Sequence, residues 1–350
     1  MQRLQLAVDA RDLVRDERGI GTYARALLTR LAQRADVRLT LLVRDPFPAR
    51  LAAGLLAAIG VSETRQVRCD NRVPRDAGVV WHPWNGTFFA SAAPAVATIH
   101  DIIPFALPAA DAERRRSQQE PIRRTASTAR AIVCDSQFTA REVQRYLDVA
   151  PHRLQAVSLG VDPVFAPGAR AALPPELGGR PYVLHVGAHD AHKNVLTLAE
   201  AHRRAFPRGE VALVFTRADP LVADAIVCER VSRATLAALY GSAAIVAVPS
   251  LYEGFGLPVL EAMACGAPVL AARGTALPEV GGDVAAYVDE PRDPAAWQRA
   301  LLDLLADPER RAGMAHHGPL RAATFSWDVC AERTFAILRA AAAPAPARPT

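Results

Sequence analysis

Short apolar runs alternate with longer segments of helical periodicity along most of the chain, and this alternation is its strongest constraint on the fold. In the segment 21–34, for example, apolar residues recur at helical spacing, and this segment lies between runs of strand length at 4–10 and 37–43. Buried strands separated by helices are typical of a parallel sheet that is covered on both faces. In the first half we expect strands at 4–10, 37–43, 78–83, 95–101, 130–136 and 154–160.

The alternation stops at the segment 161–181, which is rich in proline and glycine and reads as a linker. It then restarts, and the chain of 350 residues is longer than one typical core of ~150 residues requires. We therefore predict an α/β protein of two doubly wound, Rossmann-like domains that face each other across a cleft, with ligands at the carboxyl ends of the strands. In the second half we expect strands at 182–188, 211–217, 225–231, 243–250 and 267–273, and helices at 193–206, at 232–242 and from about 257.

These patterns predict how the chain is divided. We expect an N-terminal domain at 1–165, a linker at 166–180 and a C-terminal domain at 181–325, both Rossmann-like. A helix at 326–341 is expected to cross back to the N-terminal domain. The low-complexity tail 342–350 is predicted to be disordered.

Composition narrows the class of protein. A hydrophobic fraction of 51% and a charged fraction of 22% are typical of a globular chain. The net charge of +5, without a long basic run, favours an anionic substrate or a membrane surface over nucleic acid. Five cysteines without a CxxC motif indicate a reducing compartment. Because we find no signal-length apolar segment or bilayer-spanning run, we expect a cytoplasmic protein, either free or peripheral on the inner face of the membrane.

The segment 250–266, SLYEGFGLPVLEAMACG, places two carboxylates around a glycine-containing bend. Gly254 and Gly256 permit a sharp turn after a buried strand, and the helix that follows offers free N–H groups to an anionic or sugar ligand. Glu253 stands before the bend and Glu261 about one turn into the helix. The bend could bring one carboxylate to each end of a ligand. The alternative is an ordinary strand-to-helix turn with two solvated glutamates.

Two further groups lie where the predicted strands end. His100 and Asp101 follow the strand 95–101 and would face a ligand by the general rule for such sheets, unless they form a structural pair. Gly19 and Gly21 lie between a strand and a helix, where glycine permits close approach to a ligand. Because the third glycine of the dinucleotide fingerprint is missing, a plain helix start is the alternative.

Other features leave alternatives open. His185, His189 and His192 crowd one segment, but we expect no metal because a shared ligand geometry is not guaranteed. The six arginines of 113–130 indicate either a solvated helix face or contact with anionic lipid or a lipid-linked pyrophosphate. Trp81 and Trp84 could stack on sugar rings or fill the core.

Taken in order, these segments resemble the retaining family 4 glycosyltransferases, which have the two-domain GT-B fold. PSLYEGFGLPVLEAMACGAPVLAA is similar to the E-x7-E segment of that family. Similar stretches run from about residue 8 to residue 330, including GIGTYARALLTRLA, TIHDIIPFALP, CDSQFTAREV, VSLGVDPVFAP, HVGAHDAHKNVLTLAEA, RATLAALYGSAAIVAVPS and ALPEVGGDVAAYVD.

The resemblance implies that the domain at 1–165 binds the acceptor and that the domain at 181–325 binds the nucleotide sugar. It also implies roles for residues on the donor side of the site. Glu253 would contact hydroxyls of the donor sugar, Glu261 would hold the ribose, and Lys193 would neutralise the departing diphosphate. The arginine that many family members place upstream of the lysine is Ala188 here. His192 or Arg217 would take its place, and the remaining donor-side residues would be Val231, Gly21 and the backbone amides of Gly254, Phe255, Gly256 and Leu257.

For the other side of the site, the resemblance implies that His100 contacts the donor sugar. Asp101 would support His100 or a neighbouring loop, or meet the acceptor, and Trp84 would lie on the acceptor side. The loop with Gly19 and Gly21 would cover the diphosphate and the acceptor.

We therefore expect a retaining glycosyltransferase that moves mannose or a related deoxyhexose from a GDP-sugar to a glycan or lipid-linked glycan of a surface polysaccharide. A UDP-sugar is the alternative donor. A sugar-nucleotide epimerase of the same fold and a non-catalytic binding protein are the more distant alternatives. No cofactor, metal or nucleic-acid partner is expected.

Overall fold

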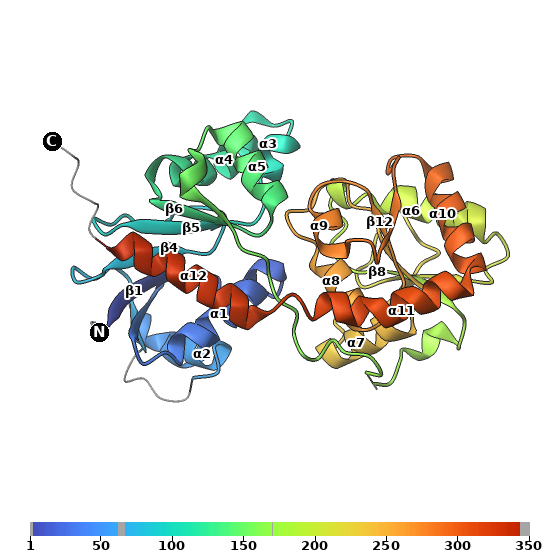
Figure 1. Cartoon of the computed structure of the whole chain (residues 1–350), viewed down its shortest axis with the longest axis horizontal. Helices are drawn as coiled ribbons and strands as arrows, with labels where there is room; N and C mark the ends of the chain where they lie inside the picture. Colours follow the sequence, from blue (N-terminus) through green and yellow to red (C-terminus); the bar gives the residue numbers. More distant parts are fainter. Residues whose placement is uncertain (1–2, 62–66, 170, 344–350) are drawn as a thin grey trace. The chain divides into compact units, whose positions relative to one another are not determined.

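The computed structural model describes residues 3–61, 67–169 and 171–343. The chain divides into two structural units, the first made of Met1–Gly160 with Trp327–Thr350 and the second of Val161–Ser326. Each unit has a parallel sheet with helices on both faces (Figure 1).

The sheet of the first unit has seven strands within the described residues, and all neighbours are parallel. The strand order reverses next to the first strand of the chain, which is the place where doubly wound sheets bind ligands. The order is β3 (Val67–Asp70), β2 (Val37–Leu42), β1 (Leu4–Asp9), β4 (Val79–His82), β5 (Ala95–Ile99), β6 (Ala131–Cys134) and β7 (Leu154–Ala156).

Helices cover this sheet on both sides. Two of them begin with side-chain caps: Asp111 accepts from the N–H of Arg114, and Ser136 accepts from the N–H of Thr139. One side carries α1 (Gly19–Ala32), α2 (Ala52–Ala58) and α12 (Trp327–Ala342), and the other carries α3 (Ile103–Ala106), α4 (Ala112–Thr128) and α5 (Gln137–Leu147) (Figure 1). Short 3-10 turns, η1 (Pro48–Arg50) and η2 (Pro151–Arg153), complete the unit.

The C-terminal helix α12 belongs to the first unit although it follows the whole of the second in sequence. It packs beside α1 and against the central strands (Figure 1). The guanidinium of Arg34 lies 3.8 Å from the ring centroid of Phe335, and Arg30 Nε lies 2.5 Å from Asp328 Oδ1. Tyr23 and Trp81 are fully buried in the core between these elements.

The second unit repeats the architecture with six parallel strands among its described residues. Its strand order reverses between the first and fourth strands of the unit, so the loops after these two strands meet at a topological switch point. The order is β10 (Ile226–Val227), β9 (Ala212–Phe215), β8 (Tyr182–His185), β11 (Ile245–Val248), β12 (Val269–Ala272) and β13 (Ala286–Val288).

The helices of the second unit also lie on both faces of the sheet (Figure 1). Trp297, Tyr240 and Phe215 are among its fully buried side chains. Its helices and 3-10 turns are η3 (Pro175–Leu177), η4 (Ala191–Lys193), α6 (Val195–Ala205), α7 (Arg233–Ser242), α8 (Leu257–Ala264), α9 (Leu277–Gly281), α10 (Pro294–Ala306) and α11 (Pro308–Ala322).

Several element predictions need correction. The predicted strand 225–231 is only the two-residue β10, and the short strands β3 and β13 were not predicted. The helix expected at 21–34 begins at Gly19 and ends at Ala32.

The proline-rich segment 161–181 packs on the second unit. Phe165 lies edge-on to Tyr240 at 5.8 Å between ring centroids, and Asp162 pairs with Arg233 at 3.1 Å. The predicted disordered tail lies outside the described residues from 344 onward. Within the described ranges, we find no helix long and apolar enough to cross a bilayer.

Candidate functional site

The switch point of the second unit joins a lysine and a glutamate that are sixty residues apart in sequence. Lys193 ends η4 after β8, and Glu253 follows β11, the neighbouring strand. The Nζ of Lys193 donates to Oε1 of Glu253 over 2.7 Å. Both side chains retain some exposure, 19% for the lysine and 13% for the glutamate. The pair is therefore held by the fold and still accessible to a ligand.

Hydrogen bonds tie the two loops of this switch point together. The N–H of Leu251 donates to the carbonyl of His192 over 2.7 Å. Asn194, in the left-handed conformation, donates through Nδ2 to the carbonyls of Pro249 at 3.2 Å and Pro291 at 2.6 Å. These bonds fix the position from which Lys193 reaches Glu253.

The Glu253 carboxylate is kept ionised by its neighbours. Burial alone raises the pKa of Glu253, but the Lys193 ammonium, with a smaller contribution from His192, outweighs burial and holds the pKa below its usual value. A partly buried ion pair of this kind offers both a cation and an anion to a polar ligand.

The bend after Glu253 depends on one glycine in particular. Gly256 has φ = 111°, and a Cβ at this position would lie 2.7 Å from Leu277 Cδ2. It directly precedes α8, where Leu257 is the first residue. Gly254 and Phe255 are buried, and the ring of Phe255 lies edge-on to that of Phe325 at 5.9 Å. The free N–H groups of α8 therefore follow the bend, as the sequence predicts.

Glu261 lies on α8 in a different electrostatic environment. Burial raises the pKa of this carboxyl to about 7, although the hydroxyl of Tyr240 donates to Oε2 over 3.0 Å and lowers it. The positive charge of Arg233 lowers the pKa further, whereas Asp162 raises it. Glu261 therefore changes its protonation state near neutral pH.

The neighbours of Glu261 were not among the predicted site residues. Tyr240 lies on α7 and is fully buried, and Arg233 opens the same helix. The guanidinium of Arg233 lies 5.1 Å from the ring centroid of Phe165 and pairs with Asp162. The helical pattern at 232–242 was visible in the sequence, but the side of α7 that meets α8 follows only from the packing.

His185 ends β8, and His189 and His192 lie in the segment that follows, with the ring centroids of His185 and His189 5.9 Å apart. Nδ1 of His185 donates to the carbonyl of Ala247 at 3.1 Å, and burial lowers the pKa of His185 to about 4, so its ring is neutral. Nδ1 of His189 lies 3.3 Å from Asp219 Oδ2. Within the described residues, no group of three or more His, Cys, Asp or Glu side chains is placed to hold a metal ion.

The remaining residues that were predicted to bind the donor, Arg217, Val231 and His192, also lie in the second unit. Arg217 is exposed and lies two residues beyond β9. Burial is the main cause of the lowered pKa of His189, and the positive charge of Arg217 also lowers that pKa. Val231 is half-buried in the loop before Ser232, which caps α7. Their contact with a donor stays a prediction, as does that of His192.

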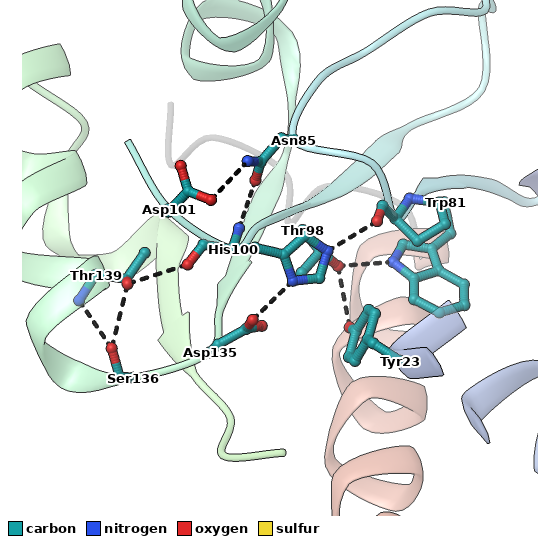
Figure 2. A network of polar contacts seen from close by, with 10 residues as sticks. Tyr23, Trp81, Asn85, Thr98, His100, Asp101, Asp135, Ser136 and Thr139 are labelled. Carbon is teal, nitrogen blue, oxygen red and sulfur yellow. Dashed lines mark hydrogen bonds and ion pairs between the residues drawn. The ribbon is translucent and has the colours of Figure 1, made fainter. Parts of the chain in front are cut away.

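In the first unit, His100 lies at the carboxyl end of β5 within a polar network (Figure 2). Its Nδ1 lies 2.7 Å from Asp135 Oδ2, and its Nε2 lies 2.9 Å from the Pro83 carbonyl oxygen. The ring of Tyr23 lies edge-on at 4.9 Å, and its hydroxyl meets Thr98, which also accepts from the indole of Trp81. His100 itself is only 6% exposed.

These contacts determine the charge of His100. A carbonyl and an ionised carboxylate only accept hydrogen bonds, so both ring nitrogens carry protons and the imidazole is a cation. Burial alone lowers the pKa of His100, but the Asp135 carboxylate and the Pro83 carbonyl outweigh it and raise the pKa above its usual value. The network therefore holds a positive charge at the end of β5.

Asp101 supports a neighbouring loop, and the partner of the His100 ring is Asp135. Oδ1 of Asp101 accepts from the N–H of Ile103 at 3.1 Å, and Asn85 contacts its other oxygen at 3.4 Å (Figure 2). Asp135 was not predicted as a site residue. It directly follows β6, and the carboxyl-end rule applied to the expected strand 130–136 would have found it.

Three further predicted site residues, Gly19, Gly21 and Trp84, lie in the first unit. Gly19 and Gly21 are the first and third residues of α1, so the structure agrees with the alternative of a helix start, and their contact with a ligand stays a prediction. A Cβ on Gly21 would lie 1.8 Å from the Asp16 carbonyl oxygen, which explains the glycine. Trp84 is 6% exposed and its indole donates to the Asp9 carbonyl at 2.7 Å, so in this structure it packs in the core.

The basic stretch 113–130 is mostly the helix α4. Most of its arginines are exposed, while Arg115 donates to the Ala109 carbonyl at 3.0 Å and Arg123 lies 4.9 Å from the ring centroid of Phe105. This is a solvated helix face, and contact with anionic lipid stays a prediction.

Family comparisons match both units. A profile described as Glycosyltransferase Family 4 matches residues 18–165, and one described as Glycosyl transferases group 1 matches residues 180–307. The order of these two matches follows the order of the two sheets.

Curated relatives are glycosyltransferases. The chain is 30% identical over 268 residues to O-antigen chain mannosyltransferase B of Escherichia coli, which covers 69% of this chain and 68% of that protein. It is 34% identical over 233 residues to a D-inositol 3-phosphate glycosyltransferase of Segniliparus rotundus, and 32% identical over 238 residues to an MMP alpha-(1->4)-mannosyltransferase of Mycolicibacterium hassiacum. These alignments cover 60% and 63% of this chain but only 52% and 56% of the two relatives.

Solved structures share the fold over nearly the whole chain. A sucrose-phosphate synthase from Thermosynechococcus elongatus superposes with a TM-score of 0.74 at 20% identity, covering 97% of this chain and 99% of that one. A HepE protein from Anabaena, in complex with UDP and glucose, gives 0.73 at 14% identity, covering 97% and 100%. The chain thus belongs to glycosyltransferase family 4 and is a hexosyltransferase with the GT-B fold.

Proposed function

We propose that the protein is a retaining hexosyltransferase that transfers mannose, or a related deoxyhexose, from a GDP-sugar to a glycan or lipid-linked glycan acceptor. The observation that carries the proposal is the Lys193–Glu253 pair at the switch point of the second unit, with the N-terminus of α8 directly after the bend. The similarity to the O-antigen chain mannosyltransferase supports mannose as the sugar.

In this proposal, the donor replaces the contact between Lys193 and Glu253. The ammonium moves to the diphosphate, where negative charge grows as the glycosidic bond breaks. The freed carboxylate of Glu253 accepts hydrogen bonds from hydroxyls of the donor sugar. The amides of Gly254, Phe255, Gly256 and Leu257 lie against the sugar and the diphosphate.

Glu261 is proposed to hold the ribose of the nucleotide. An ionised carboxylate accepts hydrogen bonds from two neighbouring hydroxyls, and the Tyr240 hydroxyl keeps the Glu261 side chain in place. Because every nucleotide has a ribose or related sugar, this contact does not select the base. UDP-sugars therefore remain the second candidate donors.

The proposed transfer keeps the configuration of the anomeric carbon. In the donor complex, Glu253 is engaged with sugar hydroxyls and is not assigned as a nucleophile. The acceptor hydroxyl then attacks from the face that the diphosphate leaves, and a phosphate oxygen of the leaving group takes its proton. The positive charge of His100 is proposed to lie toward the donor sugar in the working enzyme.

A donor panel tests the proposal. Melting temperatures are measured with GDP-, UDP-, ADP- and dTDP-sugars, because a ligand that binds only the folded state raises the melting temperature. Transfer from the best donor is then followed by NMR, which reports the configuration of the new linkage. An inverted linkage would overturn the retaining assignment, and no response to any donor would overturn the proposed function.

A further inference from the structure

The first unit contains a cavity of about 540 Å³ that is lined by residues outside the groups described above. It lies where β1 and β2 end, at the edge of the sheet where ligands bind in doubly wound folds. Its volume is within the range of small-molecule sites, roughly 300–1,000 Å³. The lining comes from residues between 10 and 15, from 43–45 and from 50–55.

Most of the charged residues that line the cavity are arginines. Four arginines, Arg11, Arg15, Arg44 and Arg50, face two aspartates, Asp12 and Asp45. One oxygen of Asp45 already accepts from the N–H of Phe47 at 2.7 Å. The cavity therefore has an excess of positive charge.

Arg11 is held in place on several sides. Its guanidinium carbon lies 3.1 Å from the ring centroid of Phe88, and its Nε lies 3.2 Å from Asp12 Oδ2 and 3.7 Å from Asp9 Oδ2. Arg44 approaches the same ring at 5.7 Å. Two guanidinium groups thus lie near one aromatic ring, and Arg11 is already ordered before a ligand binds.

The other arginines that line the cavity are Arg15, Arg44 and Arg50. Among residues 3–61, 67–169 and 171–343, Arg15, Arg44 and Arg50 form no ion pair with an aspartate or glutamate. Like charges that converge on one hollow repel each other unless an anion lies between them. Guanidinium groups match the oxygens of phosphate in particular, because their N–H groups donate in pairs.

The rim of the cavity also carries exposed apolar side chains. Val14 is 56% exposed and Leu51 is 41% exposed, and both line the cavity. A ligand that combines a phosphate with an apolar group would contact both kinds of surface.

We propose that this cavity binds the phosphate or diphosphate group of the acceptor. That the anion is part of the acceptor rests on the proposed function, whereas anion binding by the cavity does not. Two sources share this chemistry, a water-soluble sugar phosphate and a lipid-linked diphosphate. The apolar rim gives the second source an additional contact.

The test is calorimetric titration of the full chain with inorganic pyrophosphate, in a Lys193→Ala background that removes the proposed donor-side cation. Arg44→Gln in this background should weaken binding at least ~10-fold, as expected for the loss of one charge-assisted hydrogen bond. The matched control is Arg38→Gln, an exposed arginine on β2 outside the cavity, which should change the Kd by less than about twofold.

Absence of saturable binding in the Lys193→Ala background, or equal effects of the two arginine variants, would overturn the inference. Neither result would argue against the proposed function, because the titration measures pyrophosphate binding and not sugar transfer. Geranyl diphosphate and glucose 1-phosphate then separate the two sources. Tighter binding of geranyl diphosphate than of pyrophosphate supports the lipid-linked source, whereas tighter binding of glucose 1-phosphate supports the soluble one.

Discussion

The His100 imidazole and the Asp135 carboxylate lie 2.7 Å apart at the ends of two adjacent strands, and together they keep a charged histidine out of solvent. The Pro83 carbonyl, 2.9 Å from the second ring nitrogen, requires a proton there as well. Because the ring is 6% exposed, its charge depends on Asp135 more than on water. This pair leads to a prediction on stability and pH.

Asp135→Asn should lower the free energy of unfolding by about 3 kcal/mol near pH 6, the usual cost of breaking a buried pair. The pKa of His100 is raised in the folded state, so the stabilisation is complete below the unfolded value of about 6.5. It is lost as the pH rises through the folded pKa, and the effect of the substitution should shrink accordingly. Urea denaturation across pH 5.5–9 measures this.

The control for this prediction is Asp101→Asn, because Asp101 contacts backbone and Asn85 instead of the imidazole ring. NMR titration of the His100 ring should show a lower pKa in Asp135→Asn and a much smaller change in Asp101→Asn. An unchanged His100 pKa in Asp135→Asn would contradict the assignment of charge.

Glu261 should make stability fall as the pH rises. Burial raises its folded pKa to about 7, above the usual value of 4.5, so the folded state retains a proton that the unfolded state releases. This stabilisation is present below about pH 4.5 and lost as the pH rises through about 7. Glu261→Gln should therefore be more stable relative to the wild type at pH 8 than at pH 5.

Urea denaturation at the two pH values checks the Glu261 prediction. Glu290→Gln, at an exposed glutamate of the same unit, is the matched control and should show no such dependence. A Glu261→Gln variant whose relative stability is the same at pH 5 and pH 8 would disprove the raised pKa.

Gly256→Ala should destabilise the second unit by about 1–3 kcal/mol, because φ = 111° is strained for alanine and the new Cβ meets Leu277. Gly274→Ala is the control, since that glycine lacks a positive φ and no heavy atom lies within 4 Å of the added Cβ. Thermal denaturation of both variants measures the difference in stability. Equal melting temperatures of Gly256→Ala and Gly274→Ala would show that the bend does not require glycine at position 256.

Lys193→Ala and Glu253→Ala should each reduce turnover at least ~100-fold while the fold stays intact, because each loses a contact that strengthens in the transition state. Initial rates of nucleotide release in the presence of acceptor measure this, with circular dichroism as the check on folding. A rate near that of the wild type in either variant would remove that residue from the site.

The sequence predicted the two sheets well, because parallel strands buried on both faces appear as apolar runs. Most predicted strands were confirmed with ends shifted by a few residues. The strand β3 was not predicted because VRCD carries charges at Arg68 and Asp70 and so does not form an apolar run, and the strand β13 was not predicted either. The start of α1 was placed two residues late because its first residues, Gly-Ile-Gly, include two glycines, which are poor helix formers.

Side-chain partners were harder to predict than elements. The Lys193–Glu253 contact depends on β8 and β11 being neighbours, although β9 and β10 lie between them in sequence. The pairing of His100 with Asp135 likewise depends on β5 and β6 being adjacent. Local sequence patterns identify the residues at strand ends, but the strand order decides which of them meet.

The most direct test of the central claim is calorimetric titration of Glu253→Gln with GDP-mannose and, in parallel, with GDP. If Glu253 contacts the donor sugar, the variant should bind GDP-mannose at least ~10-fold more weakly than the wild type, while its affinity for GDP is not weakened. Wild-type affinity of Glu253→Gln for GDP-mannose, or for a UDP-sugar if that proves the better donor, would contradict the account.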